Sequence, residues 1–177
     1  MSLGIERGKV FLVDYDRNWA REYVAIKNKI VEATILRDSQ IEHVGSTSIR
    51  GCRAKPIIDI LVGVEDYKSL DKDFYKQMQN IGYYRLQVSR EDSIVMASFK
   101  DNDFSIHTCF IHLANYPSLK WEEMIKFRDI LNSNVVLRDE YIFLKNHLQE
   151  QYWDDRSTYT KRKGVFIKKV LENASSD

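Results

Sequence analysis

The chain has 177 residues, of which 27 are lysine or arginine and 26 are aspartate or glutamate, so its formal net charge at pH 7 is +1. This length predicts a single domain, spanning residues 1–177, with a core large enough to need no disulfide or structural metal. The balanced charge provides no global field for nucleic acid or an anionic membrane, so any anion site has to be local. Two cysteines, the lack of an apolar run of the ~18 residues that a membrane span needs, and the lack of a signal pattern favour a cytoplasmic protein with reduced thiols.

The hydrophobic pattern predicts helices and strands in the order helix, sheet, helices. Apolar residues at helical spacing predict, in chain order, helices at 19–31, 67–79, 119–132, 136–150 and 157–173. Period-two or continuous apolar runs between turn residues predict strands at 41–44, 57–63, 83–88, 93–99 and 104–113. This order indicates an α+β (mixed α/β) fold rather than a doubly wound parallel sheet.

A glycine and hydroxyl group lies between the first two predicted strands. Gly45, Ser46, Thr47 and Ser48 follow one strand and precede a predicted helical turn, where free backbone N–H groups favour an anion such as phosphate. The alternative is that Ser46 or Thr47 only caps this turn. The segment is not a P-loop, because it lacks the Gly-Lys-Ser/Thr end of that motif.

One aspartate interrupts the apolar strand at 57–63. The strand is apolar on both faces, which predicts a central position in the sheet, and alternation places Ile57, Asp59 and Leu61 on the same face. A carboxylate in such a strand is costly to bury without a partner. That partner is either Lys55, an arginine or a backbone N–H group, or it is Mg²⁺ (or Mn²⁺) beside phosphate oxygens.

Three cations lie on the inner faces of the last three predicted helices. Arg128, Lys145 and Lys163 each share a helical stripe with apolar residues, so they are candidates for one anionic ligand. The alternative for the two lysines is that their stems cover apolar surface while their ammonium groups reach water. Arg128 has a second possible partner in the neighbouring Asp129.

The histidines do not form a zinc pattern with cysteines or carboxylates. His107 and His112 are five residues apart on one predicted strand, so they face opposite sides unless a bulge intervenes. His43 lies just before the glycine at position 45, either as a hydrogen-bonded structural residue or as part of a site.

The stretch "EHVGSTSIRGCRAKPIIDILVGV" resembles the signature of the GrpB family. These bacterial proteins are related to the nucleotidyltransferase superfamily typified by DNA polymerase beta, and are similar to the domain that follows some dephospho-coenzyme A kinases. The resemblance runs over nearly the whole chain. The matching residues are Trp19, Glu42, His43, Gly45, Ser46, Thr47, Ser48, Lys55, Pro56, Asp59, His112, Phe127, Arg128, Asp129, Tyr141, Lys145, Tyr159, Thr160, Lys163, Phe166 and Ile167.

This resemblance implies a nucleotidyltransferase-like mixed sheet with helices mainly on one face and a C-terminal helical segment. In active members of the superfamily the glycine-serine turn holds a triphosphate, and acids on the next strand and on a later strand bind two metal ions. Here Leu61 stands in place of the second acid, and the later strand has His112 in place of a carboxylate. The implied metal ligand is Asp59. The implied catalytic residues are Asp59, His43, Arg128 and His112, and the implied phosphate-binding residues are Gly45, Ser46, Thr47, Ser48, Lys55, Lys145 and Lys163.

Two functions follow, and they belong to different classes. The first is a nucleotidyltransferase-like protein that binds a phosphate-containing small molecule, a nucleotide or a coenzyme, with Mg²⁺ (or Mn²⁺) and transfers a nucleotidyl group. The second is a non-catalytic nucleotide- or coenzyme-binding or accessory domain on a degenerate transferase scaffold. A third interpretation is that the polar groups form only a buried structural network. We expect neither a membrane nor a nucleic-acid partner, and the oligomeric state stays open.

Overall fold

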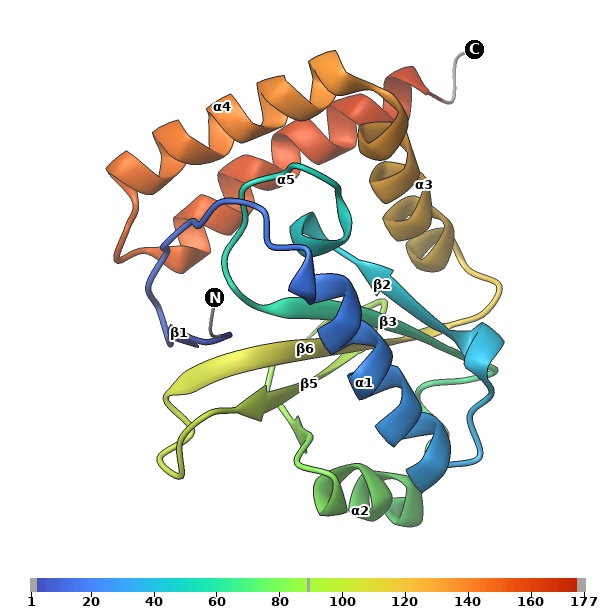
Figure 1. Cartoon of the computed structure of the whole chain (residues 1–177). Coiled ribbons are helices and arrows are strands. Elements are labelled where there is room, and N and C mark those ends of the chain that lie inside the picture. Colours follow the sequence, from blue (N-terminus) through green and yellow to red (C-terminus); the bar gives the residue numbers. More distant parts are fainter. Residues whose placement is uncertain (1–2, 89, 175–177) are drawn as a thin grey trace.

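A six-stranded mixed sheet forms the centre of the protein (Figure 1). The computed structural model describes residues 3–88 and 90–174. The strands are β1 (Ile5–Glu6), β2 (Ile41–Val44), β3 (Ile58–Val64), β4 (Tyr84–Arg85), β5 (Ile94–Phe99) and β6 (Ile106–Asn115). Their order is β2-β3-β6-β5-β4, with β1 paired to β6, and β3 and β6 run parallel while the other pairs are antiparallel. The predicted central position of β3 is confirmed.

Helices cover both faces of this sheet. They are α1 (Asn18–Ala33), α2 (Lys72–Asn80), α3 (Leu119–Ser133), α4 (Val135–Gln151) and α5 (Arg156–Asn173), with short 3-10 turns η1 (Asp38–Gln40) and η2 (Ser46–Ser48). Helices α1 and α2 pack on the face that carries Ile58 and Ile60, and α1 crosses it in Figure 1. Helix α3 packs Trp121 on Leu61 and Ala114 of the other face. The α+β fold with a helical C-terminal segment is confirmed, whereas the expectation of helices mainly on one face is wrong, because α1 and α2 pack on one face and α3 on the other. No helix of the described residues is long and apolar enough to cross a membrane.

The strand register defines the face on which the candidate site lies. Asp59 on β3 is opposite Val44 on β2 and opposite Phe110 on β6. Two positions further along β3, Leu61 is opposite His112. Residues that are opposite each other in neighbouring strands point to the same side of a sheet. We call this side, with Asp59, Leu61, Phe110 and His112, the Asp59 face.

Strand β1 was not predicted, and the strand predicted at 83–88 is reduced to β4. The starts of α2 and β6 also differ from those predicted, because aspartate side chains hold the backbone in turns. Helix α2 begins at Lys72 instead of 67, since the carboxylate of Asp71 accepts the N–H of Phe74 at 2.8 Å and caps the helix. Strand β6 begins at Ile106 instead of 104, since Asp101 accepts the N–H of Ile106 at 2.8 Å. Polar side chains that bond to nearby backbone compete with regular structure in this way.

Candidate functional site

The turn after β2 brings its backbone directly against Asp59. Gly45 has φ 71° and ψ −171°, a conformation that is close to exclusive to glycine. A Cβ atom at Gly45 would lie 2.6 Å from Oδ2 of Asp59, so no other residue fits without displacing the carboxylate. We call residues 45–48 the Gly45–Ser48 turn. Its predicted place beside Asp59 follows from this contact.

Asp59 has a histidine partner. Nε2 of His112 lies 3.4 Å from Oδ1 of Asp59. The two residues are diagonal neighbours on the parallel strands β6 and β3. Burial by itself raises the pKa of Asp59, but the hydrogen bond from His112 and the charges of His112, Lys163 and Lys55 together hold that pKa below its ordinary value. Nδ1 of His112 is buried and has no hydrogen-bond partner among the described residues. The Asp59 carboxylate is therefore ionised at neutral pH.

Three cations surround this single carboxylate. The ammonium groups of Lys55 and Lys163 lie 5.6 and 5.8 Å from the ring centre of Tyr159, and the Arg156 guanidinium lies 4.6 Å from that of Phe110. Burial, helped by the charges of Arg156 and Lys163, lowers the pKa of Lys55 to about 7, and the charge of Asp59 opposes this shift only in part. Local positive charge is therefore in excess at this site.

Lys145 stands behind the turn, in the core. Its side chain is 1% exposed, and its ammonium donates to the carbonyl of Arg53 and lies 3.0 Å from Sγ of Cys52. It also lies 4.4 Å from the ring centre of Tyr141. Burial lowers the pKa of Lys145 to about 8. The structure thus places Lys145 against the loop that follows the turn, with its head pointing inward, which is the opposite of the water-reaching alternative.

The hydroxyl groups of the Gly45–Ser48 turn bond to the protein. Oγ of Ser46 lies 3.3 Å from the hydroxyl of Tyr141, Oγ1 of Thr47 lies 3.0 Å from Nε2 of His43, and Ser48 donates to the carbonyl of Gly45 at 2.7 Å. The capping alternative is not observed, because no side chain caps η2. These hydroxyls fix the shape of the turn, and a ligand on the Asp59 face would meet its backbone first.

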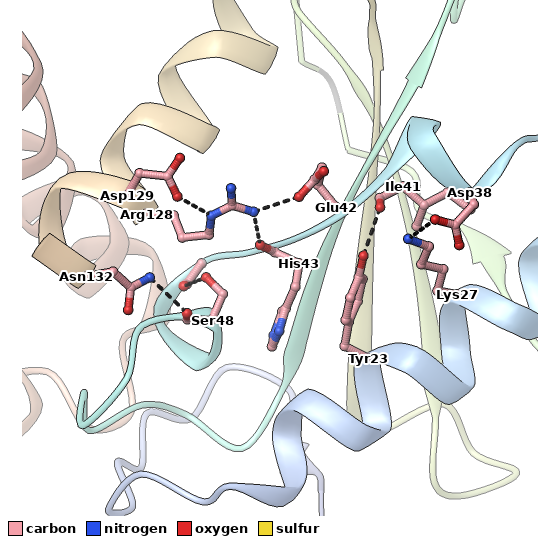
Figure 2. Close-up of polar contacts among 11 residues, drawn as sticks. Tyr23, Lys27, Asp38, Ile41, Glu42, His43, Ser48, Arg128, Asp129 and Asn132 are labelled. Atoms are coloured by element: carbon pink, nitrogen blue, oxygen red, sulfur yellow. Dashed lines mark hydrogen bonds and ion pairs between the residues drawn. The ribbon is translucent and has the colours of Figure 1, made fainter.

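Figure 2 shows His43 on β2 and Arg128 on α3, with the Arg128 guanidinium directed at Glu42 and at the His43 carbonyl. His43 is opposite Ile60 and so points to the other face, where its ring stacks on Tyr23 with centres 4.9 Å apart. Burial lowers the pKa of His43 to about 4; the charge of Asp59 opposes this shift and that of Arg128 adds to it, and the ring is neutral at pH 7.

The Arg128 guanidinium is paired with carboxylates, as its sequence neighbour had suggested. It bonds Glu42 at 2.7 Å, Asp129 at 2.7 Å and the His43 carbonyl at 3.0 Å. Arg128 also borders a cleft of about 430 Å³, which we call the β2-edge cleft. It is lined by Tyr23, His43, Ser48, Arg50, Arg128 and Asn132. The structure therefore pairs Arg128 with carboxylates and turns His43 to the other face of the sheet, while the charge of Asp59 still acts on the His43 ring.

A bulge turns His107 to the Asp59 face, so that His107 and His112 point to the same side of the sheet. Without a bulge, strand alternation would have placed them on opposite sides. The register shifts between Ser98 and Phe99 on β5, so that Phe99 is opposite His107. The His107 ring lies 5.1 Å from that of Phe110. Arg156, which is also near Phe110, was missed by the sequence analysis. Its position at the start of α5, seven residues before Lys163, is the signal that could have found it.

The described residues contain no group of three or more histidine, cysteine or acidic side chains that could hold a metal ion. The buried Leu61 stands where the family resemblance predicts a second metal-binding acid. Glu42 is opposite Leu61, but its carboxylate bonds to Arg128. Mg²⁺ needs about six oxygen ligands. Asp59 alone does not form a two-metal centre, although one ion carried by a phosphate ligand is compatible with it.

Comparisons with known proteins agree on one family. A family model described as GrpB protein matches residues 9–173. The "Glutamate-rich protein GrpB" of Alkalihalophilus pseudofirmus is 39% identical over 172 residues, which cover 96% of this chain and 98% of that protein. Among solved structures, the conserved protein GrpB from Enterococcus faecalis aligns with a TM-score of 0.69 and 24% identity over 91% of this chain and 99% of that chain. A Cid1 poly(U) polymerase structure aligns at a TM-score of 0.52 and 15% identity over 85% of this chain and 49% of that chain, which is a likeness of fold alone.

Proposed function

This chain belongs to the GrpB family, and we propose that it binds a phosphate-containing small molecule, a nucleotide or a coenzyme, on the Asp59 face. The observation that carries the proposal is the excess of positive charge there. Lys55, Arg156 and Lys163 surround one carboxylate, and among the described residues none of the three forms an ion pair. Cations that are held close together repel one another, and a bound anion offsets this repulsion, so the binding of an anion is favourable.

The lowered pKa of Lys55 supports the same proposal. A lysine whose pKa is about 7 is held partly neutral by burial and by neighbouring cations. A phosphate group would reverse that shift, because an opposite charge stabilises the ammonium. Binding would therefore draw a proton onto Lys55, and the affinity would be highest at a pH at which Lys55 is already protonated.

Gly45 supplies a third argument. Because it has no side chain, the backbone of the Gly45–Ser48 turn approaches Oδ2 of Asp59 closely. A glycine of this kind typically allows a ligand or another chain segment to come close to the backbone. Phosphate oxygens above the turn would lie between its backbone and the ammonium groups of Lys55 and Lys163.

Binding without transfer is the form of this function that the side chains favour. The likeness of fold to the Cid1 poly(U) polymerase suggests nucleotidyl transfer as a second candidate. Transfer through two metal ions needs carboxylates that the described residues do not supply, since Leu61 and His112 occupy their positions. Mg²⁺ bound to phosphate oxygens and to Asp59 is compatible with both functions, and it is a variable of the experiment.

The test is a ligand panel of nucleoside triphosphates, coenzyme A and dephospho-coenzyme A, each with and without Mg²⁺ or Mn²⁺. The melting temperature and the dissociation constant are measured for the wild type, Asp59→Asn, Lys55→Met and the control Lys169→Met, which alters an exposed lysine of α5. A ligand at 100-fold its dissociation constant adds ~2.7 kcal/mol, which shifts the melting temperature by several degrees.

We expect one class of ligand to raise the melting temperature of the wild type and of Lys169→Met. The same ligand should bind Lys55→Met at least tenfold more weakly. A metal-dependent shift that Asp59→Asn abolishes would place an ion at Asp59. Release of pyrophosphate from a bound triphosphate together with a nucleotidylated acceptor would establish transfer, release with a free nucleoside monophosphate would indicate hydrolysis, and binding without release would establish the non-catalytic function. Equal binding by Lys55→Met and the wild type, or no shift with any ligand, would refute the proposal.

A further inference from the structure

The β2-edge cleft lies outside the Asp59 face. Its volume of about 430 Å³ is within the range of small-molecule sites. Side chains from α1, β2, the Gly45–Ser48 turn, the following loop and α3 contribute to its lining, so residues far apart in the sequence converge on it (Figure 2). The state of the hydrogen-bonding groups around it indicates the kind of ligand that fits.

The outward-facing backbone acceptors of β2 are already occupied. Strand β2 is at one edge of the sheet. The hydroxyl of Tyr23 donates to the Ile41 carbonyl at 2.9 Å, and the Arg128 guanidinium donates to the His43 carbonyl at 3.0 Å (Figure 2). An added β-strand would have to displace both bonds, and covering an edge in this way is how proteins prevent such pairing. The occupant of the cleft is therefore not a peptide strand.

The carboxylates near the cleft are paired with Arg128, and the amide side chain that lines it is bonded to the protein. Glu42 and Asp129 both accept hydrogen bonds from Arg128. The amide of Asn132 is used at both ends, because Oδ1 accepts the N–H of Arg50 at 2.9 Å and Nδ2 donates to the carbonyl of Ser48 at 3.2 Å. Each carboxylate bonds Arg128 through one oxygen, and neither Glu42 nor Asp129 is among the residues that line the cleft.

Donors remain available. The exposed Arg50 guanidinium forms no ion pair with any carboxylate in the described part of the chain. The Arg128 bonds use Nε and Nη1, and none of the described contacts uses Nη2. The N–H of His43 points the same way as its carbonyl, toward the open edge, because residues of an antiparallel strand bond outward or inward with both groups together. A cleft that, among the described residues, is lined by two arginines with free donors and by no carboxylate selects an anion.

We propose that the β2-edge cleft binds the oxyanion group of a small molecule, with Arg50 as its main cationic contact and Arg128 at its rear. This site is distinct from the proposed phosphate site, because neither Asp59 nor any of Lys55, Arg156 and Lys163 lines the cleft. Phosphate and carboxylate compounds both provide the required chemistry, and the two sources are distinguished by the experiment.

The experiment is a titration of ¹⁵N-labelled full-length protein with inorganic phosphate and, separately, with malonate, followed through the backbone amide signals. The variant is Arg50→Gln, which removes an exposed charge and leaves the backbone bonds to Asn132 intact. The matched control is Arg21→Gln, an exposed arginine of α1 that does not line the cleft.

We expect saturable shifts of the Ser48, Arg50 and Asn132 amides in the wild type and Arg21→Gln, and affinity at least tenfold weaker in Arg50→Gln, as for loss of one charge-assisted hydrogen bond. Saturation by phosphate alone would identify a phosphoryl ligand, and saturation by malonate alone a carboxylate. Unsaturable shifts with both anions, or equal affinity of Arg50→Gln and the wild type, would overturn the proposal. Shifts confined to the amides of Lys55 and Asp59 would do so while supporting the proposed phosphate site.

Discussion

Replacing Gly45 by alanine tests the close contact between the turn and Asp59. The new methyl group would lie 2.6 Å from Oδ2, 2.9 Å from Cβ and 3.0 Å from Cγ of Asp59. Overpacking of this kind costs ~1–3 kcal/mol, and the glycine-only backbone conformation at φ 71° costs a further ~1–3 kcal/mol. We therefore expect Gly45→Ala to lower the free energy of unfolding by about 2–6 kcal/mol.

Urea denaturation of three glycine variants separates the two contributions. Gly82→Ala has a positive φ of 88° but no atom within 4 Å of the new Cβ, so it should cost only the backbone strain of ~1–2 kcal/mol. Gly164→Ala, in helix α5 with open space around it, should stabilise the protein by ~0.5–1 kcal/mol. In an Asp59→Ala background the cost of Gly45→Ala should fall by about 1–2 kcal/mol, since two of the three colliding atoms are gone. The reasoning is refuted if Gly45→Ala lowers the free energy of unfolding no more than Gly82→Ala does. It is also refuted if the effects of Gly45→Ala and Asp59→Ala are additive.

Three further predictions concern buried basic groups. Lys145→Ala should lower the free energy of unfolding by about 2–4 kcal/mol in urea denaturation, because the variant loses the packed stem and leaves the Arg53 carbonyl without its donor; a change below ~1 kcal/mol would contradict this. As the pH falls from 6.5 to about 4, stability should decrease, because unfolded His43 takes up a proton that the folded ring, with its lowered pKa, does not; urea midpoints across this range should decrease less for His43→Gln. The affinity for the phosphate ligand should fall as the pH rises above about 7, where Lys55 loses its proton, and calorimetry on Lys55→Arg should show a flatter profile; identical profiles would exclude Lys55 from the site.

The locations of Lys55 and Lys145 show where sequence reasoning reaches its limit. Both are lysines next to apolar residues, and both were predicted to bind phosphate. The structure places the Lys55 ammonium beside Tyr159 on the Asp59 face and the Lys145 ammonium on a backbone carbonyl in the core. Helical periodicity identifies the inner face of a helix, but it does not identify which neighbour lies opposite. That neighbour depends on how α4 packs against a loop about 90 residues earlier.

The hydrogen-bond partner of Asp59 shows the same limit for residues on the strands. Strand alternation correctly placed Asp59 and Leu61 on the same face. It did not predict His112 as the hydrogen-bond partner, because that contact requires β3 and β6 to be parallel neighbours in one particular register. The bulge at Ser98 and Phe99, which turns His107 to the Asp59 face, is likewise absent from the alternating pattern.

Local patterns in the amino-acid sequence were sufficient for the order of helices and strands, the central position of β3, the tight turn at Gly45 and the family. These features depend on residues that are close together in the chain, whose periodicity and backbone preferences act over a few positions. Only the tertiary structure decided which charges meet: Asp59 with His112, Arg128 with Glu42, and Lys145 with the Arg53 carbonyl. Hydrogen bonds and ion pairs weaken steeply with distance, and the distance between residues 50 or 90 positions apart is set by the packing of the whole domain.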